Sequence, residues 1–323
     1  MNILILSAGR RVELIQSFRR AARRLEIESN IVSGDCSDTA PALYFSDRTY
    51  KLPRISEPNY LESIIQACDQ ENISLIIPTI DTDLLLLAKY RSFIENKTNA
   101  KVMISDTRVV EICRDKTKTH HFFESNVFGS PKMYSDEELL HAEIQFPLFI
   151  KPKSGSSSVD TFVVNNFEEL NLFRSIIKEP IIQDFIEGDE YTVDVFLDFN
   201  STIITVVPRL RLATRDGEIS KGRIIKDREI IDDVKRMMEL LKPIGHITIQ
   251  LMKTKNGIKY IEINPRFGGG APMSIQSGAD SCENLYRIML GEQLTYNEDY
   301  RDNITFLRYD SSICLDENMR LVK

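Results

Sequence analysis

Short apolar runs alternate with amphipathic stretches over the first hundred residues. Residues 3–6, Ile-Leu-Ile-Leu, form a continuous apolar run, which is typical of a strand buried on both faces of a parallel sheet. The same pattern predicts further strands at 31–33, 75–77 and 101–104, and helices at about 12–25, 59–71 and 82–95. Because strands and helices alternate, we expect a parallel α/β sheet that binds ligands beyond the carboxyl ends of its strands.

Polar residues follow the predicted strands at those ends. Arg10 and Arg11 stand after the first strand in a segment that lacks the G-x-G-x-x-G spacing of a dinucleotide site, and the chain contains no P-loop sequence. The pair could bind an anionic substrate, with Arg10 as the candidate contact, although such pairs more often form a solvated helix face. Asp81 could bind a substrate amine, but we expect Asp81 and Asp83 to cap the helix that begins near Asp83.

A second unit follows with a different pattern. Lys116 stands at the start of a helix predicted to end near residue 126, and the apolar run 146–150 leads directly into Lys151. Small residues at 154–158 then precede the apolar run 162–164, which predicts a β-hairpin with a flexible tip. Backbone N–H groups at such a tip can close over a polyphosphate that Lys151 also reaches. A plain mobile loop is the alternative.

A β-hairpin near the carboxyl end shows the clearest alternation of apolar and polar positions. Apolar residues share one face of its first strand, and Glu262 and Asn264 share one face of its second. A two-residue turn would place Leu251 opposite Glu262, whereas a three-residue loop at 255–257 places Leu251 opposite Ile261 and Gln250 opposite Glu262. We expect the three-residue loop, because it pairs apolar with apolar positions.

Three oxygen-bearing side chains then meet on one face of the hairpin, namely Gln250, Glu262 and Asn264. A carboxylate flanked by amides suits Mg²⁺ that is shared with phosphate oxygens. Arg266 follows the strand-ending Pro265 and places a guanidinium beside the proposed metal. The alternative is an ordinary amphipathic hairpin with one solvated face.

Composition narrows the class of protein. A length of 323 residues allows two or three domains, and a net charge of −7 argues against a protein that mainly binds nucleic acid or an anionic membrane. The five cysteines form no C-x-x-C pair, which is typical of reduced thiols. The first strand leaves no room for a secretion signal, and no apolar run approaches the roughly 20 residues of a membrane span. We therefore expect a cytoplasmic protein that acts on small molecules.

The order of these features resembles the ATP-grasp superfamily. A lysine on a helix, a lysine on a strand before a Ser/Gly loop, an apolar segment at 181–186 followed by Glu-Gly-Asp-Glu, and a Gln…Glu-x-Asn hairpin occur in that order. The ligase half of the carbamoyl-phosphate synthase large subunit and small amino-acid ligases of the pyrrolysine pathway are similar. The resemblance implies an α/β ATP-grasp fold with a parallel-sheet domain at 1–110, a small mobile lid at 111–185 and a carboxyl-terminal α+β domain at 186–323.

The resemblance also implies roles for individual residues. The nucleotide would be held by Lys116 and Lys151 at the phosphates, by Ser154, Gly155, Ser156 and Ser157 in the lid loop, by Gln183, Asp184, Phe185 and Ile186 at the adenine, and by Glu190 at the ribose. Mg²⁺, or Mn²⁺ in its place, would bind Gln250, Glu262 and Asn264. Arg266 and Lys151 would be catalytic. Arg209 and Arg211, which alternate on a predicted strand and so face the same way, could assist at the substrate or form a surface ladder.

The implied activity is that of an ATP- and Mg²⁺-dependent carboxylate–amine ligase. Such an enzyme forms an acyl phosphate on a small metabolite, here an amino acid or a related carboxylate, and releases ADP and phosphate. A carbamoyl-phosphate-synthase-like enzyme is an alternative, although the chain has no internal repeat. A nucleotide-binding protein without turnover is another. The partners would be a carboxylate and an amine, and a homodimer is the assembly we consider.

Overall fold

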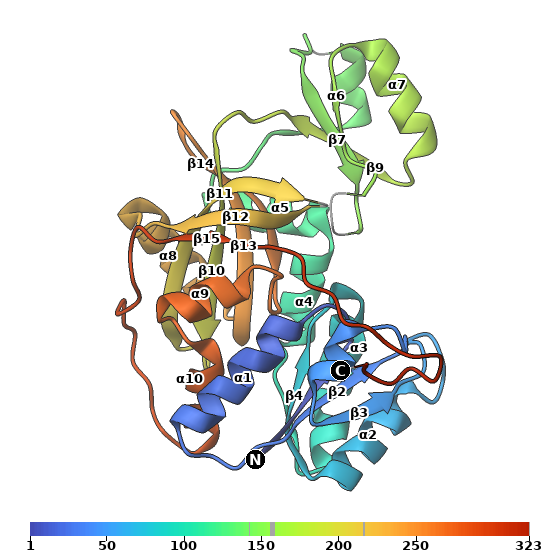
Figure 1. Cartoon of the computed structure of the whole chain (residues 1–323). Coiled ribbons are helices and arrows are strands. Elements are labelled where there is room, and N and C mark those ends of the chain that lie inside the picture. The colour runs from blue at the N-terminus through green and yellow to red at the C-terminus, as the bar shows by residue number, and fades with distance from the viewer. Residues whose placement is uncertain (142, 156–158, 216, 323) are drawn as a thin grey trace.

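Parallel strands and their helices build the amino-terminal part of the molecule (Figure 1), in a computed structural model that describes residues 1–141, 143–155, 159–215 and 217–322. A five-stranded sheet has the order β3-β2-β1-β4-β5. Its neighbouring strands are all parallel. The strands are β1 (Asn2–Leu6), β2 (Ile31–Asp35), β3 (Arg48–Lys51), β4 (Ile73–Pro78) and β5 (Lys101–Val102). The predicted parallel sheet is therefore confirmed.

Both faces of this sheet are covered, as the continuous apolar run of β1 predicts. Ile3 and Ile5 point into a core that includes α1, and Leu4 and Leu6 point into a second core that includes α2 and α3. The helices on this sheet are α1 (Val12–Arg24), α2 (Tyr60–Glu71) and α3 (Asp81–Lys97), and a short 3₁₀ helix spans Pro41–Phe45. No helix in the described ranges is both long and apolar enough to cross a membrane.

An antiparallel sheet of six strands forms the middle of the molecule, in the order β14-β13-β10-β11-β12-β15. Its strands are β10 (Asp189–Leu197), β11 (Ile203–Arg215), β12 (Glu218–Ile224), β13 (Gly245–Thr254), β14 (Gly257–Asn264) and β15 (Thr305–Leu307). The helices α4 (Thr107–Arg114), α5 (Lys116–Ser125) and α8 (Arg228–Leu241) pack on one face. On the other face α9 (Ala271–Ser277) and α10 (Ser281–Met289) share a core with α1 and β1, so the first sheet is docked onto the second.

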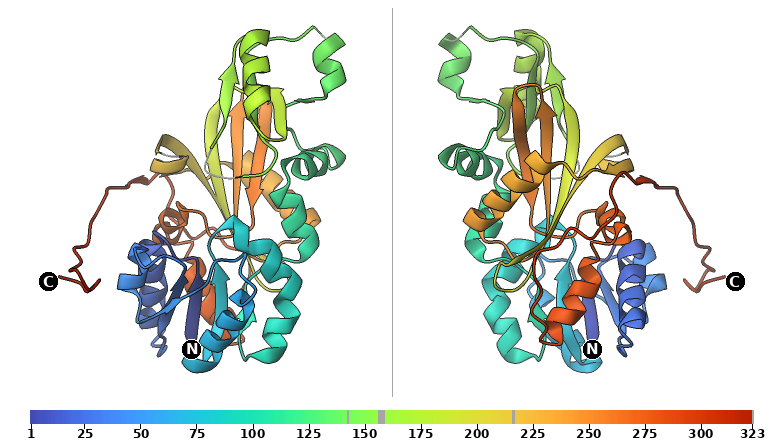
Figure 2. Two further views of the ribbon diagram at one scale, coloured as in Figure 1. Left: turned by 90° about the vertical axis from the view of Figure 1, so that its right-hand side faces the viewer. Right: turned by 90° about the vertical axis from the view of Figure 1, so that its left-hand side faces the viewer.

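A small sheet of four strands stands at the opposite end of the molecule from the amino-terminal sheet (Figure 2). It has the order β6-β9-β7-β8, with β6 (Met133–Tyr134), β7 (Leu148–Pro152), β8 (Phe162–Val164) and β9 (Pro180–Asp184). Its own core includes side chains of α6 (Asp136–His141) and α7 (Phe167–Ile176). The antiparallel pairing of β7 with β8 confirms the hairpin predicted at 146–164. The domain limits at 110 and 185 stay predictions.

The β13–β14 hairpin has a different turn from the one predicted, but Gln250 still lies opposite Glu262. Gln250 is paired with Glu262, as predicted, but Leu251 is paired with Tyr260 rather than Ile261. The turn has two residues, because Thr254 is paired with Gly257, and a β-bulge takes up the extra residue. Tyr260 explains the difference, since its ring fills the core position and its hydroxyl donates to Asp233 at 2.7 Å.

Candidate functional site

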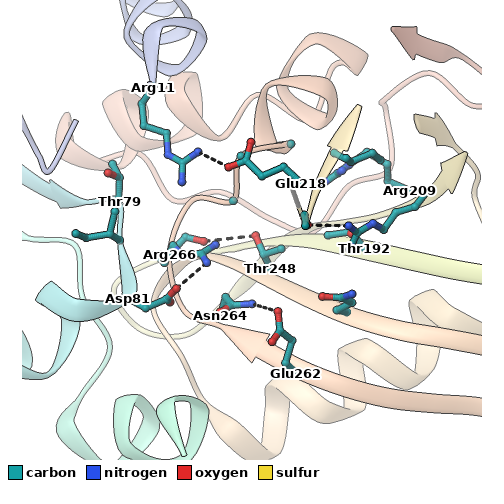
Figure 3. A pocket seen from close by; sticks show the side chains of 18 of the residues that line it. Arg11, Thr79, Asp81, Thr192, Arg209, Glu218, Thr248, Glu262, Asn264 and Arg266 are labelled. Carbon is teal, nitrogen blue, oxygen red and sulfur yellow. Dashed lines mark hydrogen bonds and ion pairs between the residues drawn. The ribbon is translucent and has the colours of Figure 1, made fainter. Parts of the chain in front are cut away.

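The face of the hairpin that carries Gln250, Glu262 and Asn264 builds the centre of the site (Figure 3). Asn264 Nδ2 donates to Glu262 Oε1 at 2.9 Å, and Gln250 Nε2 donates to Glu190 Oε1. Each amide thus uses its nitrogen on a carboxylate and leaves its oxygen available. These oxygens and the Glu262 carboxylate form a set of hard donors that fits a magnesium ion. Within the described ranges no three His, Cys, Asp or Glu side chains are grouped for a metal. A metal at this position would therefore also need the amide oxygens.

Two lysines approach Glu262 from other elements. Lys151 lies on β7 with 5% of its surface exposed, and Lys116 opens α5. Burial lowers the pKa of Lys151 to about 8, with Glu262 opposing that shift and Lys116 adding to it. Burial likewise lowers the pKa of Lys116, again opposed by Glu262. The three groups therefore share one electrostatic environment between the four-stranded and six-stranded sheets. The phosphate contacts that the resemblance implies for the two lysines stay predictions.

The predicted lid loop is described only in part. Ser154 and Gly155 are exposed, and Gly155 has a φ of 128° with open space where a Cβ atom would lie. Lys116 Nζ donates to the carbonyl of Gly155 at 3.0 Å. Ser156 and Ser157 lie outside the described residues. The loop therefore begins beside the lysines, where a polyphosphate would bind, and its role as a lid stays a prediction.

The predicted adenine and ribose residues follow one another between the two antiparallel sheets. Gln183 and Asp184 end β9, and Phe185 and Ile186 lie in the connection to β10. Asp184 Oδ1 accepts from Tyr134 at 2.7 Å, which holds this end of β9. Phe185 is 37% exposed and is free to contact a flat ligand. The adenine role of these residues stays a prediction.

Glu190 lies at the start of β10, on the face that carries the metal donors. Arg211 Nη1 pairs with its Oε1 at 2.9 Å, and Gln250 donates to the same carboxylate. Glu190 therefore links β10, β11 and β13. Both interactions use Oε1, and Oε2 makes no hydrogen bond to the described residues. The predicted contact of Glu190 with the ribose stays a prediction.

A cavity of about 360 Å³ opens beside the metal donors. Four arginines and three carboxylates line it, namely Arg11, Arg209, Arg211, Arg266, Asp81, Glu218 and Glu262. Backbone from the loop Gly268–Gly270 forms another part of the wall. A Cβ atom on Gly269 would come within 2.6 Å of the Glu218 carboxyl group, so a side chain there would displace this carboxylate. The excess of arginines suits an anionic substrate.

Asp81 binds Arg266 and does not cap α3, which corrects our expectation. The helix begins at Asp81, its N-cap is Ile80, and no side chain caps it. Arg266 Nη2 donates to Asp81 Oδ2 at 2.9 Å (Figure 3). Asp83 also has another role, since it accepts from Ser7 at 2.6 Å. The carboxyl edge of the amino-terminal sheet thus orients the arginine beside the metal donors.

Arg209 and Arg211 both line the cavity. They therefore face the same way, as their alternation predicted. Arg209 is 1% exposed and pairs with the buried Asp194 at 2.9 Å, while its Nε and Nη1 have no hydrogen-bond partner in the described chain. Arg211 also donates to the carbonyl of Gly217 at 2.8 Å, just before β12 begins. The surface-ladder alternative does not fit side chains this buried.

Arg11, and not Arg10, lines the cavity. Arg10 is exposed, whereas Arg11 Nη1 donates to Glu218 Oε1 at 3.3 Å. Two functional candidates were missed by sequence reasoning, namely Glu218 and Arg308, whose Nη1 donates to Glu218 Oε2 at 3.0 Å. Neither belongs to a motif. For Arg11, the sequence offered one signal, namely its position next to the candidate Arg10.

Known proteins share this architecture. A family model for the ATP-grasp domain matches residues 113–270, and one for the PylC-like N-terminal domain matches residues 3–103. The carbamoyl-phosphate synthase of Methanobrevibacter smithii is 24% identical over 187 residues, which cover 56% of this chain and 49% of that protein. The 3-methyl-D-ornithine–L-lysine ligase of Methanosarcina acetivorans is 23% identical over 292 residues, which cover 89% of this chain and 73% of that protein.

A solved structure agrees with this match. The biotin carboxylase domain of the 2-oxoglutarate carboxylase from Hydrogenobacter thermophilus, solved with MgADP and bicarbonate, superposes with a TM-score of 0.74 at 17% identity, over 94% of this chain and 73% of that chain. The protein therefore has the ATP-grasp fold. It belongs to the ATP-grasp superfamily, with a PylC-like domain at its amino terminus. The chain spans about half the length of the matched synthase.

Proposed function

We propose that this protein is an ATP- and Mg²⁺-dependent carboxylate–amine ligase that acts through an acyl phosphate. The observation that carries the proposal is the convergence of the oxygen donors Gln250, Glu262 and Asn264 with the buried Lys151 and with Arg266 at one cavity. One matched relative is named as a ligase of two amino acids, and the solved neighbour holds MgADP. Both support a nucleotide-dependent joining reaction.

The site supplies positive charge where phosphate would bind. Lys151, with a pKa of about 8, is mostly protonated at neutral pH and can pair with phosphate oxygens. Lys116 lies beside it. Gln250, Glu262 and Asn264 would hold a metal ion, which would supply further positive charge to the phosphates. Because phosphoryl transfer depends mainly on positioning and electrostatics, this arrangement requires no catalytic triad.

Arg266 marks the position of the reacting carboxylate. Its Nη2 is fixed by Asp81, and its Nε is buried with no hydrogen-bond partner among the described residues. In the proposed reaction a substrate carboxylate oxygen attacks the γ-phosphorus of ATP, and ADP leaves. An amine then attacks the acyl carbon, the carbon–oxygen bond to phosphate breaks, and phosphate leaves. Arg266 stabilises the negative charge that grows in both steps.

The reaction products test this proposal. Screening carboxylates paired with amines should reveal combinations that release ADP and orthophosphate in equal amounts. When the carboxylate oxygens carry a heavy isotope, one labelled oxygen should appear in the phosphate. Glu262→Gln should abolish release without unfolding the protein. Release of AMP and pyrophosphate would overturn the mechanism, and ATP consumption that needs no carboxylate would overturn the proposed function.

A further inference from the structure

Two arginines from distant parts of the chain meet on Glu218 at the edge of the cavity. Arg11 Nη1 lies 3.3 Å from Glu218 Oε1, and Arg308 Nη1 lies 3.0 Å from Glu218 Oε2. Figure 3 shows Arg11 reaching Glu218 from the start of α1. Burial raises the pKa of Glu218, but Arg11 and Arg308 outweigh it and hold the pKa below its usual range. Glu218 is therefore a carboxylate at neutral pH.

Backbone pairing sets the position of Arg308. The edge strand β15 pairs antiparallel with β12 through Phe306 and Gly222. One residue beyond β15, the Arg308 N–H donates to the carbonyl of Ser220 at 2.9 Å, and its Nη1 also donates to the carbonyl of Ile219 at 3.0 Å. Arg308 lies outside the two matched domains, which end at residues 103 and 270. The segment after β15 thus brings Arg308 to Glu218, which is one of the residues that line the cavity.

The cluster of Arg11, Glu218 and Arg308 carries a net positive charge. It carries two guanidinium groups and one carboxylate, and Gly269 packs beneath that carboxylate. Arg11 Nη2 and Arg308 Nη2 make no hydrogen bond with any residue that the structure describes. Free N–H donors on two adjacent arginines suit a carboxylate. The remaining lone pairs of Glu218 suit an amine N–H.

We propose that this cluster binds the head group of the amine substrate, so that the amine comes from an amino acid and not from ammonia or a simple amine. The substrate carboxylate binds Arg11 and Arg308, and its amine lies beside Glu218. Arg308 is also a positioning residue, because it holds Glu218 against Arg11. This inference rests on the proposed ligase function and adds the class of its second substrate.

Paired substrates test the inference. Amino acids would be compared with their decarboxylated amines, for example alanine with ethylamine, serine with 2-aminoethanol and phenylalanine with 2-phenylethylamine, and with ammonium. Turnover to ADP and phosphate should be at least tenfold more efficient in kcat/KM with an amino acid than with its amine. In Arg308→Gln the KM for the amino acid should rise about tenfold or more, with kcat and the KM for ATP changing less than about threefold. Arg308→Lys should recover part of the loss.

Arg223→Gln is the matched control. Arg223 Nε donates to Thr305 Oγ1 of β15 at 3.1 Å, so this exposed arginine anchors the same segment to β12. A rise in KM of the same size in Arg223→Gln would show that Arg308 acts only as an anchor and would overturn its positioning role. Equal efficiency with amines or ammonium would overturn the inference and leave the ligase function intact. In a separate binding test with MgADP present, failure of every amino acid to raise the melting temperature would also overturn it.

Discussion

Replacing Lys151 by methionine should stabilise the nucleotide-free protein while it removes nucleotide binding. Burial lowers the pKa of Lys151 from 10.5 to about 8, with Glu262 opposing the shift and Lys116 adding to it. Since one pH unit corresponds to ~1.4 kcal/mol, the buried cation destabilises the native state by about 3 kcal/mol at neutral pH. Methionine has a similar length and no charge. Lys151→Met should therefore raise the free energy of unfolding by up to about 3 kcal/mol.

The pH dependence of this difference has a defined sign. Below the native pKa of about 8, both the native and the unfolded chain carry the proton on Lys151 and the full penalty applies. Between about 8 and 10.5 the native lysine is neutral while the unfolded lysine still binds a proton, so wild-type stability rises with pH. The advantage of Lys151→Met should therefore shrink by up to ~1.4 kcal/mol per pH unit in that range.

Urea unfolding at about pH 7 and about pH 9.5, without nucleotide or metal, measures both quantities. Lys153→Met is the matched control, because Lys153 is more exposed and pairs with Asp115 at 3.3 Å. It should change stability by less than ~1 kcal/mol at either pH. Mg²⁺-ATP should raise the melting temperature of the wild type and not that of Lys151→Met. A stability difference that is the same at both pH values would refute the reasoning.

Three further changes separate function from stability. Glu262→Gln should leave urea unfolding nearly unchanged and remove the Mg²⁺-dependent step in ATP binding, measured by titration with and without the metal. Ile263→Ala should do the reverse, because Ile263 is 1% exposed in the core, and should lower the free energy of unfolding by about 2–5 kcal/mol. Asp194→Asn leaves the buried Arg209 without its ion pair, so the free energy of unfolding should fall by about 3–5 kcal/mol. Unchanged urea midpoints for the last two would contradict the assigned cores.

Periodic parts of the site could be predicted from the sequence. Alternation placed Glu262 and Asn264 on one face, and the structure brings Gln250 opposite Glu262 as expected. The loop predicted to produce that register was wrong, because the pattern treated Ile261 as the core residue. Tyr260 fills the core instead, with a ring 5.5 Å from that of Phe123. Tyrosine has an apolar ring and a polar hydroxyl, so a pattern that classes each residue as either apolar or polar does not predict its burial at such a position.

Contacts between distant elements could not be predicted. The capping rule explains aspartates near a helix start, yet Asp81 binds Arg266, 185 residues away. Choosing Arg10 over Arg11 failed for the same reason, since only packing of α1 on the middle sheet decides which arginine turns inward. Glu218 and Arg308 carry no local signal, because their contact depends on the pairing of an edge strand.

The two sides of the site belong to different hydrophobic cores. The amino-terminal sheet and the middle sheet share one core through α1, α9 and α10, so Asp81 and Arg11 are held rigidly against Arg266 and Glu218. The four-stranded sheet that carries Lys151 has a separate core and shares no residue with the others. A shift of that sheet would therefore change the nucleotide site without disturbing the substrate cavity. In the proposed reaction, substrate selection would then depend on the rigid pair of sheets, and the nucleotide would bind between the small sheet and the metal donors of the six-stranded sheet.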